Sequence, residues 1–398
     1  MNVMSGGQAG VHAPTDRPGA VAQPGWFSRL MLPAAVFLSV LTGGGYASGR
    51  EIVEYGAKFG AYGVWSIVAI FVGFTVISAI AYEFARVFHA YDYRTYMRNL
   101  IGPAWILFDV LFIVMAVLVI AIVTSAAEEI VATTVRIPSL VALLVVIGIV
   151  GLIMFWGRRF LEAFKSVGSL LLYVGFIAFA AMVLAGRWEA VQAVFARGDT
   201  SYVPGATVGA AVFSGLLYVG YNLVVVPGVL FVLDNLRSPK DSAGAGVLTG
   251  LVSTVPFILT YLAVMAFYPS RDVLDAPVPW LAMLEQVGGA GLGWVYTLVV
   301  FYTLVDTSTG MIHAILNRLD SALQEYGRQE LGGRHRSAIA VAILIASVLL
   351  SRFGIIALVA QGYTAMAYGF LLLLALPLVT VGLYKIAKAR SQRGEVTA

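Results

Sequence analysis

The chain has 398 residues, of which 60% are hydrophobic and only 12% are charged. Soluble domains carry about 25% charged residues, so this composition excludes a soluble globular protein and indicates an integral membrane protein. The net charge of +4 does not indicate nucleic-acid binding, because the basic residues lie in short loops between apolar segments, and the lack of cysteine excludes disulfides and thiolate metal sites.

Residues 1–26 are rich in Gly, Ala and Pro and contain no apolar core of a signal peptide, so we predict a disordered tail there. Beyond it, apolar stretches of about 18 residues mark membrane spans. The sequence predicts an all-α integral membrane protein with ten transmembrane helices, at 31–55, 62–85, 105–131, 140–156, 160–185, 207–232, 247–267, 292–316, 339–350 and 355–384.

Shorter segments connect these spans. The external linker at 187–206 is predicted to contain an interfacial helix at 188–195. A further helix is expected to open at Pro277 and Pro279 and to run toward Val287. Residues 389–398 form a C-terminal tail in this interpretation.

The loops between the predicted spans carry basic residues unevenly. Ten spans place both termini on one side of the membrane, and that side then holds 18 of the 25 Lys and Arg residues. Loops rich in Lys and Arg face the cytoplasm. Both tails are therefore predicted to be cytoplasmic.

The first span interrupts itself. Residues 31–41 have the pattern of an apolar helix, but Gly43, Gly44, Gly45 and Gly49 follow within seven residues. Each glycine weakens a helix by roughly 1 kcal/mol relative to alanine, and unwound backbone at membrane depth is tolerated where it lines a cavity or is buried in protein. The sixth span has a weaker break at 219–222, where the glycine alone also fits close packing between helices.

Each break lies in the first helix of a five-span unit. Because five is odd, the second unit has the opposite orientation, so we expect a 5+5 inverted repeat of residues 27–186 and 207–388, with a binding site at the two breaks. This arrangement resembles the LeuT-like fold of the amino acid–polyamine–cation superfamily. The stretch 43–52 (GGGYASGREI) is similar to the start of the YkvI-like amino acid permeases, a bacterial group. The resemblance implies a transporter in the bacterial cytoplasmic (inner) membrane.

The unwound backbone at 42–45 offers carbonyls to a cation and helix-start amides to a carboxylate, which favours small amino-acid-like substrates. The predicted substrate-binding residues lie at or near the two breaks: Gly43, Gly44, Gly45, Tyr46, Tyr218, Tyr221, Asn222 and Gln361. A single tyrosine, Tyr363 included, fits packing equally well, since the chain is rich in aromatic residues. Tyr221 and Asn222 are favoured because they lie at the break itself.

The eighth span carries a polar cluster, VDTSTG at 305–310, in otherwise apolar sequence. In the resembled fold, hydroxyls of the eighth helix face carbonyls of the first and bind Na⁺. The resemblance thus implies a sodium site from Thr42, Gly45, Asp306, Thr307 and Ser308, with Ser308 and Thr309 as another possible hydroxyl pair. The competing interpretation is that these hydroxyls bond to carbonyls of their own helix.

Asp306 is the most specific residue of this cluster, because an ionisable side chain inside a span is costly unless it has a function or a partner. It suits a sodium ligand, a proton carrier or an ion-pair partner. His313 lies seven residues later on the same helical face. It fits either a proton relay with Asp306 or, preferably, a histidine whose hydrogen bonds are satisfied near the end of the helix.

Charged residues at the outer ends of the first and third spans predict a gate or a coupling element. Arg50 and Glu51 belong to the first span, and Glu128 and Glu129 to the third. An ion pair from Arg50 to Glu128 or Glu129 would close the outer side, or Arg50 would hold a substrate carboxylate. Ordinary ion pairing at headgroup level is the alternative.

These features predict a secondary transporter that works by alternating access, coupled to Na⁺ or, through Asp306, to H⁺, with a small-molecule substrate and no other cofactor. The chain has no GxxxxGK[ST] nucleotide-binding motif. Its four histidines are scattered and it has no GxSxG motif, so an enzyme is not expected. An ion or solute channel is the remaining alternative, although two broken helices favour an occluded site over a continuous pore.

Overall fold

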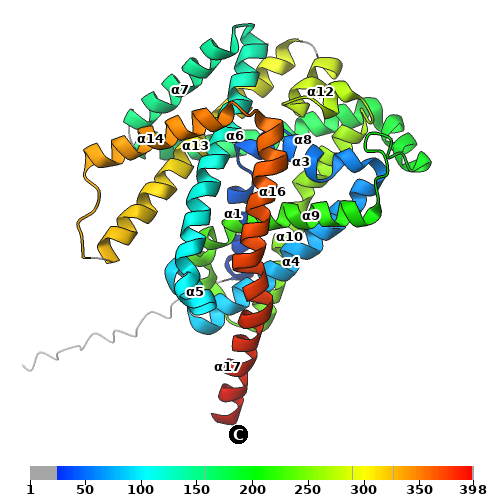
Figure 1. The fold of residues 1–398 in the computed structure, drawn as a ribbon. Helices are drawn as coiled ribbons and strands as arrows, with labels where there is room; N and C mark the ends of the chain where they lie inside the picture. The colour runs from blue at the N-terminus through cyan, green and yellow to red at the C-terminus, as the bar shows by residue number, and fades with distance from the viewer. Residues whose placement is uncertain (1–24, 157, 289, 326, 397–398) are drawn as a thin grey trace, which may run out of the picture.

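The computed structural model describes residues 25–156, 158–288, 290–325 and 327–396. Within these ranges every regular element is helical (Figure 1). Among the described residues, eight helices are long and apolar enough to cross a membrane, and two shorter apolar helices span Phe27–Leu41 and Ser139–Ile149. Each segment overlaps one of the ten predicted spans, with bounds that differ most in the first and fifth, and the prediction of an all-α membrane protein is confirmed. The tail predicted at 1–26 lies, except for its last two residues, outside the described residues.

The first span is broken at two points. It comprises η1 (Phe27–Met31), α1 (Leu32–Leu41), the short α2 (Gly44–Ala47) and α3 (Arg50–Tyr55). Thr42 leaves the helical region with φ −81° and ψ 65°, and Gly49 has the left-handed φ of +81°. The glycine run therefore produces the predicted interruption. The chain leaves the helix at Thr42 and again at Gly49, and the single turn α2 lies between them.

The rest of the first half is a series of helices. It consists of η2 (Ala57–Tyr62), α4 (Gly63–Phe88), α5 (Tyr93–Ile101), η3 (Gly102–Ala104), α6 (Trp105–Val135), α7 (Ser139–Trp156) and α8 (Arg158–Arg197). Arg187, with φ −136° and ψ 22°, kinks α8. The kink separates the fifth span from the segment predicted as an interfacial helix.

The second half begins with another broken span, formed by α9 (Val208–Asn222), η4 (Leu223–Gly228) and η5 (Leu230–Asn235). The break begins after Asn222 and not at Gly220. Pro227 lies inside η4, and proline cannot donate to an α-helical ladder. A Cβ at Gly220 would lie 2.9 Å from Leu371 Cγ, so this glycine serves close helix packing.

The remaining elements complete the second five spans and their loops. They are α10 (Pro239–Met265), α11 (Arg271–Leu274), α12 (Pro279–Val287), α13 (Ala290–Glu325), α14 (Gly333–Ser351), α15 (Ile355–Ala357), η6 (Leu358–Tyr363), α16 (Thr364–Phe370), η7 (Leu371–Ala375), η8 (Leu378–Gly382) and α17 (Leu383–Val396). The segments α15 to α17 run on from one another as one long rod (Figure 1).

Helices of the first half pack against helices of the second half in corresponding pairs. The second span, α4, packs on the seventh, α10, and the third, α6, packs on the eighth, α13. Likewise α4 contacts α9 of the sixth span, as α10 contacts α1 of the first. Exchanging spans one to five with six to ten maps these contacts onto each other, as a two-fold relation between repeats requires.

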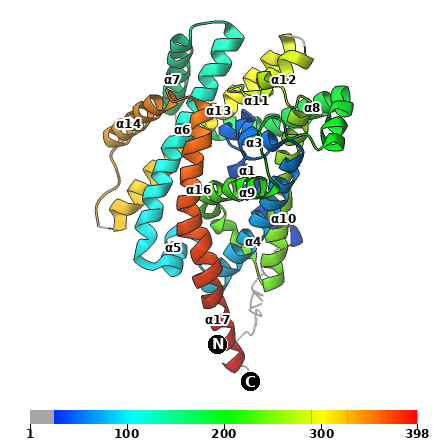
Figure 2. The same ribbon diagram turned by 45° about the vertical axis from the view of Figure 1, so that its right-hand side comes forward.

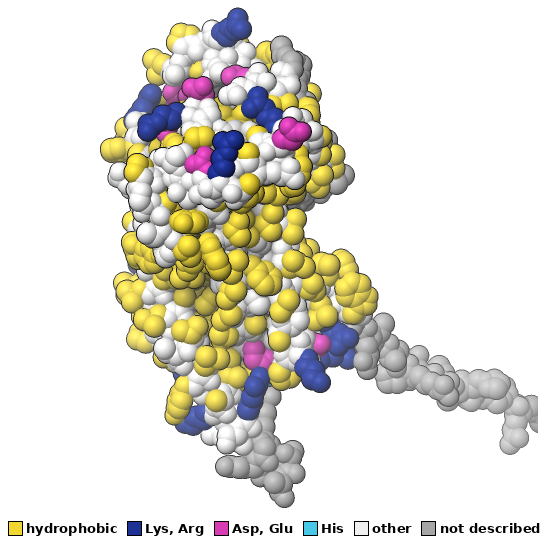
Figure 3. All heavy atoms as spheres, turned by 90° about the vertical axis from the view of Figure 1, so that its right-hand side faces the viewer, with side chains coloured by type: hydrophobic (Ala, Val, Ile, Leu, Met, Phe, Trp, Pro, Cys, Tyr) yellow, Lys and Arg dark blue, Asp and Glu magenta, His cyan; other side chains and the backbone are white. Residues whose placement is uncertain are grey.

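Charged groups mark the two ends of the molecule. In Figure 3, Lys, Arg, Asp and Glu side chains gather at the top and bottom, and hydrophobic side chains form the belt between them. Arg29 before α1 pairs with Asp241 of α10 at 3.3 Å, and Arg390 of α17 pairs with Glu83 of α4 at 2.7 Å. The end that carries these pairs is the terminal face; the end covered by α11 and α12 is the distal face (Figure 2).

Candidate functional site

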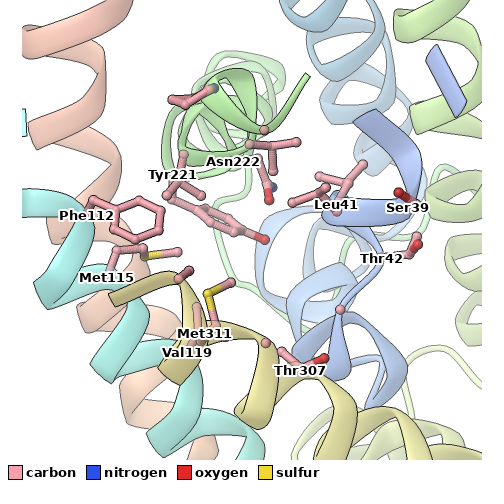
Figure 4. A pocket seen from close by; sticks show the side chains of 18 of the residues that line it. Ser39, Leu41, Thr42, Phe112, Met115, Val119, Tyr221, Asn222, Thr307 and Met311 are labelled. Atoms are coloured by element: carbon pink, nitrogen blue, oxygen red, sulfur yellow. The ribbon is translucent and has the colours of Figure 1, made fainter. Parts of the chain in front are cut away.

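A cavity of about 670 Å³ lies where the two broken spans meet. Four spans supply the side chains that Figure 4 labels around it: Thr42 on the first, Met115 on the third, Tyr221 on the sixth and Thr307 on the eighth. Concave sites at such junctions are where small ligands bind, with an apolar wall and a few convergent polar groups. The cavity is therefore the candidate substrate site.

The cavity extends to the terminal face. Its lining continues through Ser39, Tyr93 and Arg318. Tyr93 lies on α5, and α5 is held to α17 by Lys385, whose ammonium donates to the Asn99 carbonyl at 2.5 Å. At this mouth Arg318 forms an ion pair with Asp109 of α6, which also accepts a hydrogen bond from the Tyr93 hydroxyl at 2.7 Å. The sequence analysis did not identify the Asp109–Arg318 pair.

The distal face is closed above the cavity by Arg50. This side chain is only 4% exposed, and its Nη1 donates to the carbonyls of Leu274 at 2.6 Å and Ala276 at 3.4 Å. Its Nη2 lies 3.6 Å from a carboxylate oxygen of Glu54. The planar guanidinium thus ties α3 to the loop between α11 and α12, a geometry that a lysine would not reproduce.

Aromatic residues complete this closure. The Tyr46 ring packs edge-on against Phe176, and Phe176 packs against Trp280 of α12, with centroids 6.0 and 5.5 Å apart. In the loop before α9, burial raises the pKa of Tyr202 to about 12. Its hydroxyl therefore keeps its proton, which it donates to Asp275 at 2.5 Å. The cavity is open toward the terminal face and closed toward the distal face.

Four of the predicted substrate residues line the cavity: Gly43, Tyr46, Tyr221 and Asn222. Asn222 is held by its side-chain amide, which donates to the Tyr218 carbonyl at 2.9 Å. Tyr221 is stacked on Tyr363 of η6, with ring centroids 4.4 Å apart, and Tyr363 also lines the cavity.

The other predicted substrate residues have different positions. Tyr218 is buried behind the lining, where its ring packs on Tyr55 and Phe257. Gln361 is exposed and lies outside the cavity. Gly44 and Gly45 form the first half of the helical turn α2.

The predicted sodium residues divide into two groups. Thr42, Asp306 and Thr307 line the cavity, and a Cβ on Gly43 would lie 3.5 Å from Thr307 Oγ1, so the break and α13 are in contact. Ser308 is buried and donates to the Leu304 carbonyl of its own helix at 3.0 Å. Gly45 belongs to α2.

Other polar groups of α13 follow the structural alternative. The Thr309 hydroxyl donates to the Asp306 carbonyl at 2.9 Å, and His313 Nδ1 lies 2.9 Å from the Thr309 carbonyl. These contacts are internal to one helix. They do not join Asp306 and His313 in a relay.

The predicted gate residues are also separated. Arg50 bonds to α11–α12 and Glu54, and no contact joins it to Glu128 or Glu129 among the described residues. Glu129 instead lies 3.4 Å from the Thr133 hydroxyl of its own helix. Glu51 lines the cavity and accepts a hydrogen bond from Tyr221 at 2.5 Å. The described ranges hold no cluster of three or more His, Cys, Asp or Glu side chains spaced for a metal ion.

Comparisons with known proteins bear on this architecture. No protein-family model matches the chain. The chain is 22% identical over 339 residues to the membrane protein YkvI of Bacillus subtilis, a protein without a characterised function, covering 84% of this chain and 91% of YkvI.

Solved transporter structures share the fold. A mutant form of a manganese transporter from Eremococcus coleocola superposes with a TM-score of 0.55 and 16% identity, over 88% of this chain and 78% of that one. A Na⁺-coupled sialic acid symporter, in a substrate-bound outward-open state, superposes with a TM-score of 0.53 and 12% identity, over 90% and 85% of the two chains. At these identities the likeness establishes the fold, and the predicted LeuT-like architecture is confirmed.

Proposed function

We propose that this chain is a cation-coupled secondary transporter that moves a small amino-acid-like solute by alternating access. The observation that carries the proposal is the central cavity at the two helix breaks, open to one face and closed at the other by Arg50 and its carbonyl partners. One-sided access to a site at the junction of the repeats is what alternating access requires. The transporter names of the structural neighbours support a transporter over an enzyme.

The distribution of charge suggests which face is cytoplasmic. The predicted loops on the terminal side hold 18 of the 25 Lys and Arg residues, and such loops stay inside. We therefore place the terminal face in the cytoplasm of a bacterial cell, with the protein in the cytoplasmic membrane. The described conformation is then inward-open.

The coupling ion that the lining favours is Na⁺. Asp306 and Thr307 of α13 face the break at Thr42 and Gly43. Together they offer a carboxylate, the Thr307 hydroxyl and unwound backbone. Hard cations bind such oxygen ligands. The hydroxyls of Ser308 and Thr42 are not part of the proposed site, because they donate to the carbonyls of Leu304 at 3.0 Å and Leu38 at 2.7 Å in their own helices.

Proton coupling through Asp306 is the second candidate. This carboxyl is half-buried inside a span and lines the cavity, and such intramembrane acids form proton relays in transporters. A channel is less favoured, because the buried Arg50 closure interrupts any continuous path.

The test is thermal stability of the purified protein in detergent, titrated with NaCl against choline chloride at constant ionic strength. A bound ion stabilises the folded state by mass action, so we expect a saturable, sodium-specific rise in melting temperature. Thr307→Val should abolish the rise. Thr309→Val is the matched control, because Thr309 is buried, bonds within its own helix and does not line the cavity.

Absence of a sodium-specific shift would contradict sodium coupling. Uptake into proteoliposomes driven by a pH gradient, and its loss in Asp306→Asn, would then support the proton-coupled alternative. Loss of the sodium response in both threonine variants would instead assign the effect to general disturbance of α13.

A further inference from the structure

Glu51 occupies the point where the two broken spans touch. It lies in the first turn of α3, is 5% exposed and lines the central cavity. The hydroxyl of Tyr221, on α9, donates to its Oε2 at 2.5 Å. A hydrogen bond between the first and sixth spans therefore fixes this carboxyl at the centre of the site.

No positive side chain neutralises this carboxyl within the described residues. Its neighbour Arg50 points elsewhere, to Glu54 and to the carbonyls of Leu274 and Ala276. The hydrogen bond from Tyr221 reaches Oε2 of Glu51, and the residue borders the cavity. A buried carboxylate without a counter-charge is strongly destabilising, so the arrangement is suited to receiving a cation from the cavity.

Aromatic rings pack against Tyr221, which holds the carboxyl. Tyr221 is stacked on Tyr363, and the ring of Tyr55 lies 5.3 Å from that of Tyr221. The Tyr55 hydroxyl is engaged with the Val359 carbonyl at 3.1 Å. Tyrosine faces attract organic cations, and one carboxylate flanked by rings suits an ammonium group better than a bare metal ion, which needs more oxygen ligands.

The charges along the cavity support a cation at its centre. The two arginines in the lining, Arg94 and Arg318, lie toward the mouth, where Arg318 pairs with Asp109. The Asp and Glu residues deeper in the lining are Glu51 and Asp306, and no Lys or Arg lines that part of the cavity among the described residues. Asp306 belongs to the proposed sodium site, which leaves Glu51 for a second positive group.

We propose that Glu51, positioned by Tyr221 and flanked by Tyr363, binds the protonated amino group of the substrate. The substrate class is then small molecules with a primary ammonium group, whether or not they carry a carboxylate. This inference rests on the proposed function, because it names the substrate class of the same cavity.

The test uses two sets of compounds, and the members of each set share an apolar side chain. One set is L-leucine, 3-methylbutylamine and 4-methylpentanoate; the other is L-phenylalanine, phenethylamine and 3-phenylpropanoate. Melting curves of the purified protein are recorded with each compound in NaCl. We expect the amines and amino acids of at least one set to raise the melting temperature and the carboxylate-only compounds to have no effect.

Glu51→Gln keeps the volume and the Tyr221 contact but removes the charge. We expect the amine concentration for half-maximal stabilisation to rise about tenfold or more, as loss of a charge-assisted hydrogen bond predicts. Glu51→Asp should retain part of the response. Glu285→Gln, an exposed acid on α12 outside the cavity, is the control and should respond like the wild type.

Three results would overturn the inference: stabilisation by the carboxylate-only compounds equal to that by the amines, an unchanged amine response in Glu51→Gln, or no amine response of the wild type in either set. The melting temperature and size-exclusion profile of unliganded Glu51→Gln show whether it folds. The sodium titration separates the two proposals, because an amine response without a sodium response would remove sodium coupling and leave the role of Glu51 intact.

Discussion

Gly49 is the residue at which the first span changes direction below α12. Its φ of +81° is a conformation that L side chains rarely adopt, and a Cβ there would lie 2.9 Å from Trp280 Cδ1. The Trp280 amide also donates to the Ser48 carbonyl at 3.4 Å. Backbone conformation and close approach thus both require glycine at this position.

We predict that Gly49→Ala lowers the stability of the purified protein. The left-handed conformation alone costs about 1–2 kcal/mol for a residue with a Cβ, and displacement of Trp280 adds to this. The measurement is the melting temperature in detergent. Gly148→Ala is the control, because a Cβ at Gly148 in α7 meets no atom within 4 Å. Equal melting temperatures of Gly49→Ala and wild type would show that the break relaxes without cost.

Sequence reasoning at the residue scale succeeded where a polar group interrupts an apolar span. Asp306, Thr307 and Asn222 were selected on that basis, and all three line the cavity. Asp109 satisfies the same rule within the third span and was overlooked. Glu51 was assigned to the gate because it follows Arg50 in the chain. Successive residues of a helix point about 100° apart, so Glu51 faces the cavity while Arg50 faces the α11–α12 loop.

At the scale of elements, glycine content located the first break well and the second less well. Glycines at 43–45 and 49 make the helix costly, so the chain leaves it at Thr42 and again at Gly49. In the sixth span the stronger signal was Pro227, which lacks an amide hydrogen and forces the change from α9 to η4. Sequence alone did not reveal that Gly220 packs closely against Leu371, because Leu371 belongs to an element far away in the chain.

The connection between α3 and the α11–α12 loop leads to a prediction about the gate. Lysine at position 50 would keep the charge but lose the fork that reaches two carbonyls and Glu54. We expect Arg50→Lys to open the distal face more often. In a chain without native cysteine, Ala47→Cys, which lies buried beneath this closure, should react about several-fold faster with a maleimide supplied from the distal side.

The matched control for the gate is Arg271→Lys. Arg271 lies in α11 and is 80% exposed at its side chain. Its contacts, with Asp275 at 3.8 Å and with the Tyr202 ring at 6.0 Å from the centroid, are weak and can be kept by a lysine, so its replacement should leave the labelling rate of Ala47→Cys unchanged. An unchanged rate in Arg50→Lys as well would mean that the aromatic contacts of Tyr46, Phe176 and Trp280 suffice to hold the distal face closed.

At the scale of the whole molecule, the ten-span architecture was predictable because two independent patterns agree. Apolar length located the spans, and the distribution of Lys and Arg tested their number, since one span more or fewer would have mixed the two sets of loops. The pairing of α4 with α10 and of α6 with α13 depends on side-chain packing between the repeats. Hydropathy carries no information about that packing, so the sequence predicted the repeats but not their contacts.

The orientation of the molecule gives the last prediction, which the cysteine-free sequence makes direct to test. Ser39→Cys lies in the cavity lining toward the terminal face, and Asp272→Cys lies exposed on α11 at the distal face. If the basic loops are cytoplasmic, a membrane-impermeant maleimide added to intact cells should label only Asp272→Cys, and permeabilised cells should label both. The opposite pattern would invert the topology and make the described state outward-open.

Met311→Cys lies deeper in the same cavity. In inside-out vesicles it should be labelled by the maleimide as Ser39→Cys is, because the path to it runs through the terminal face.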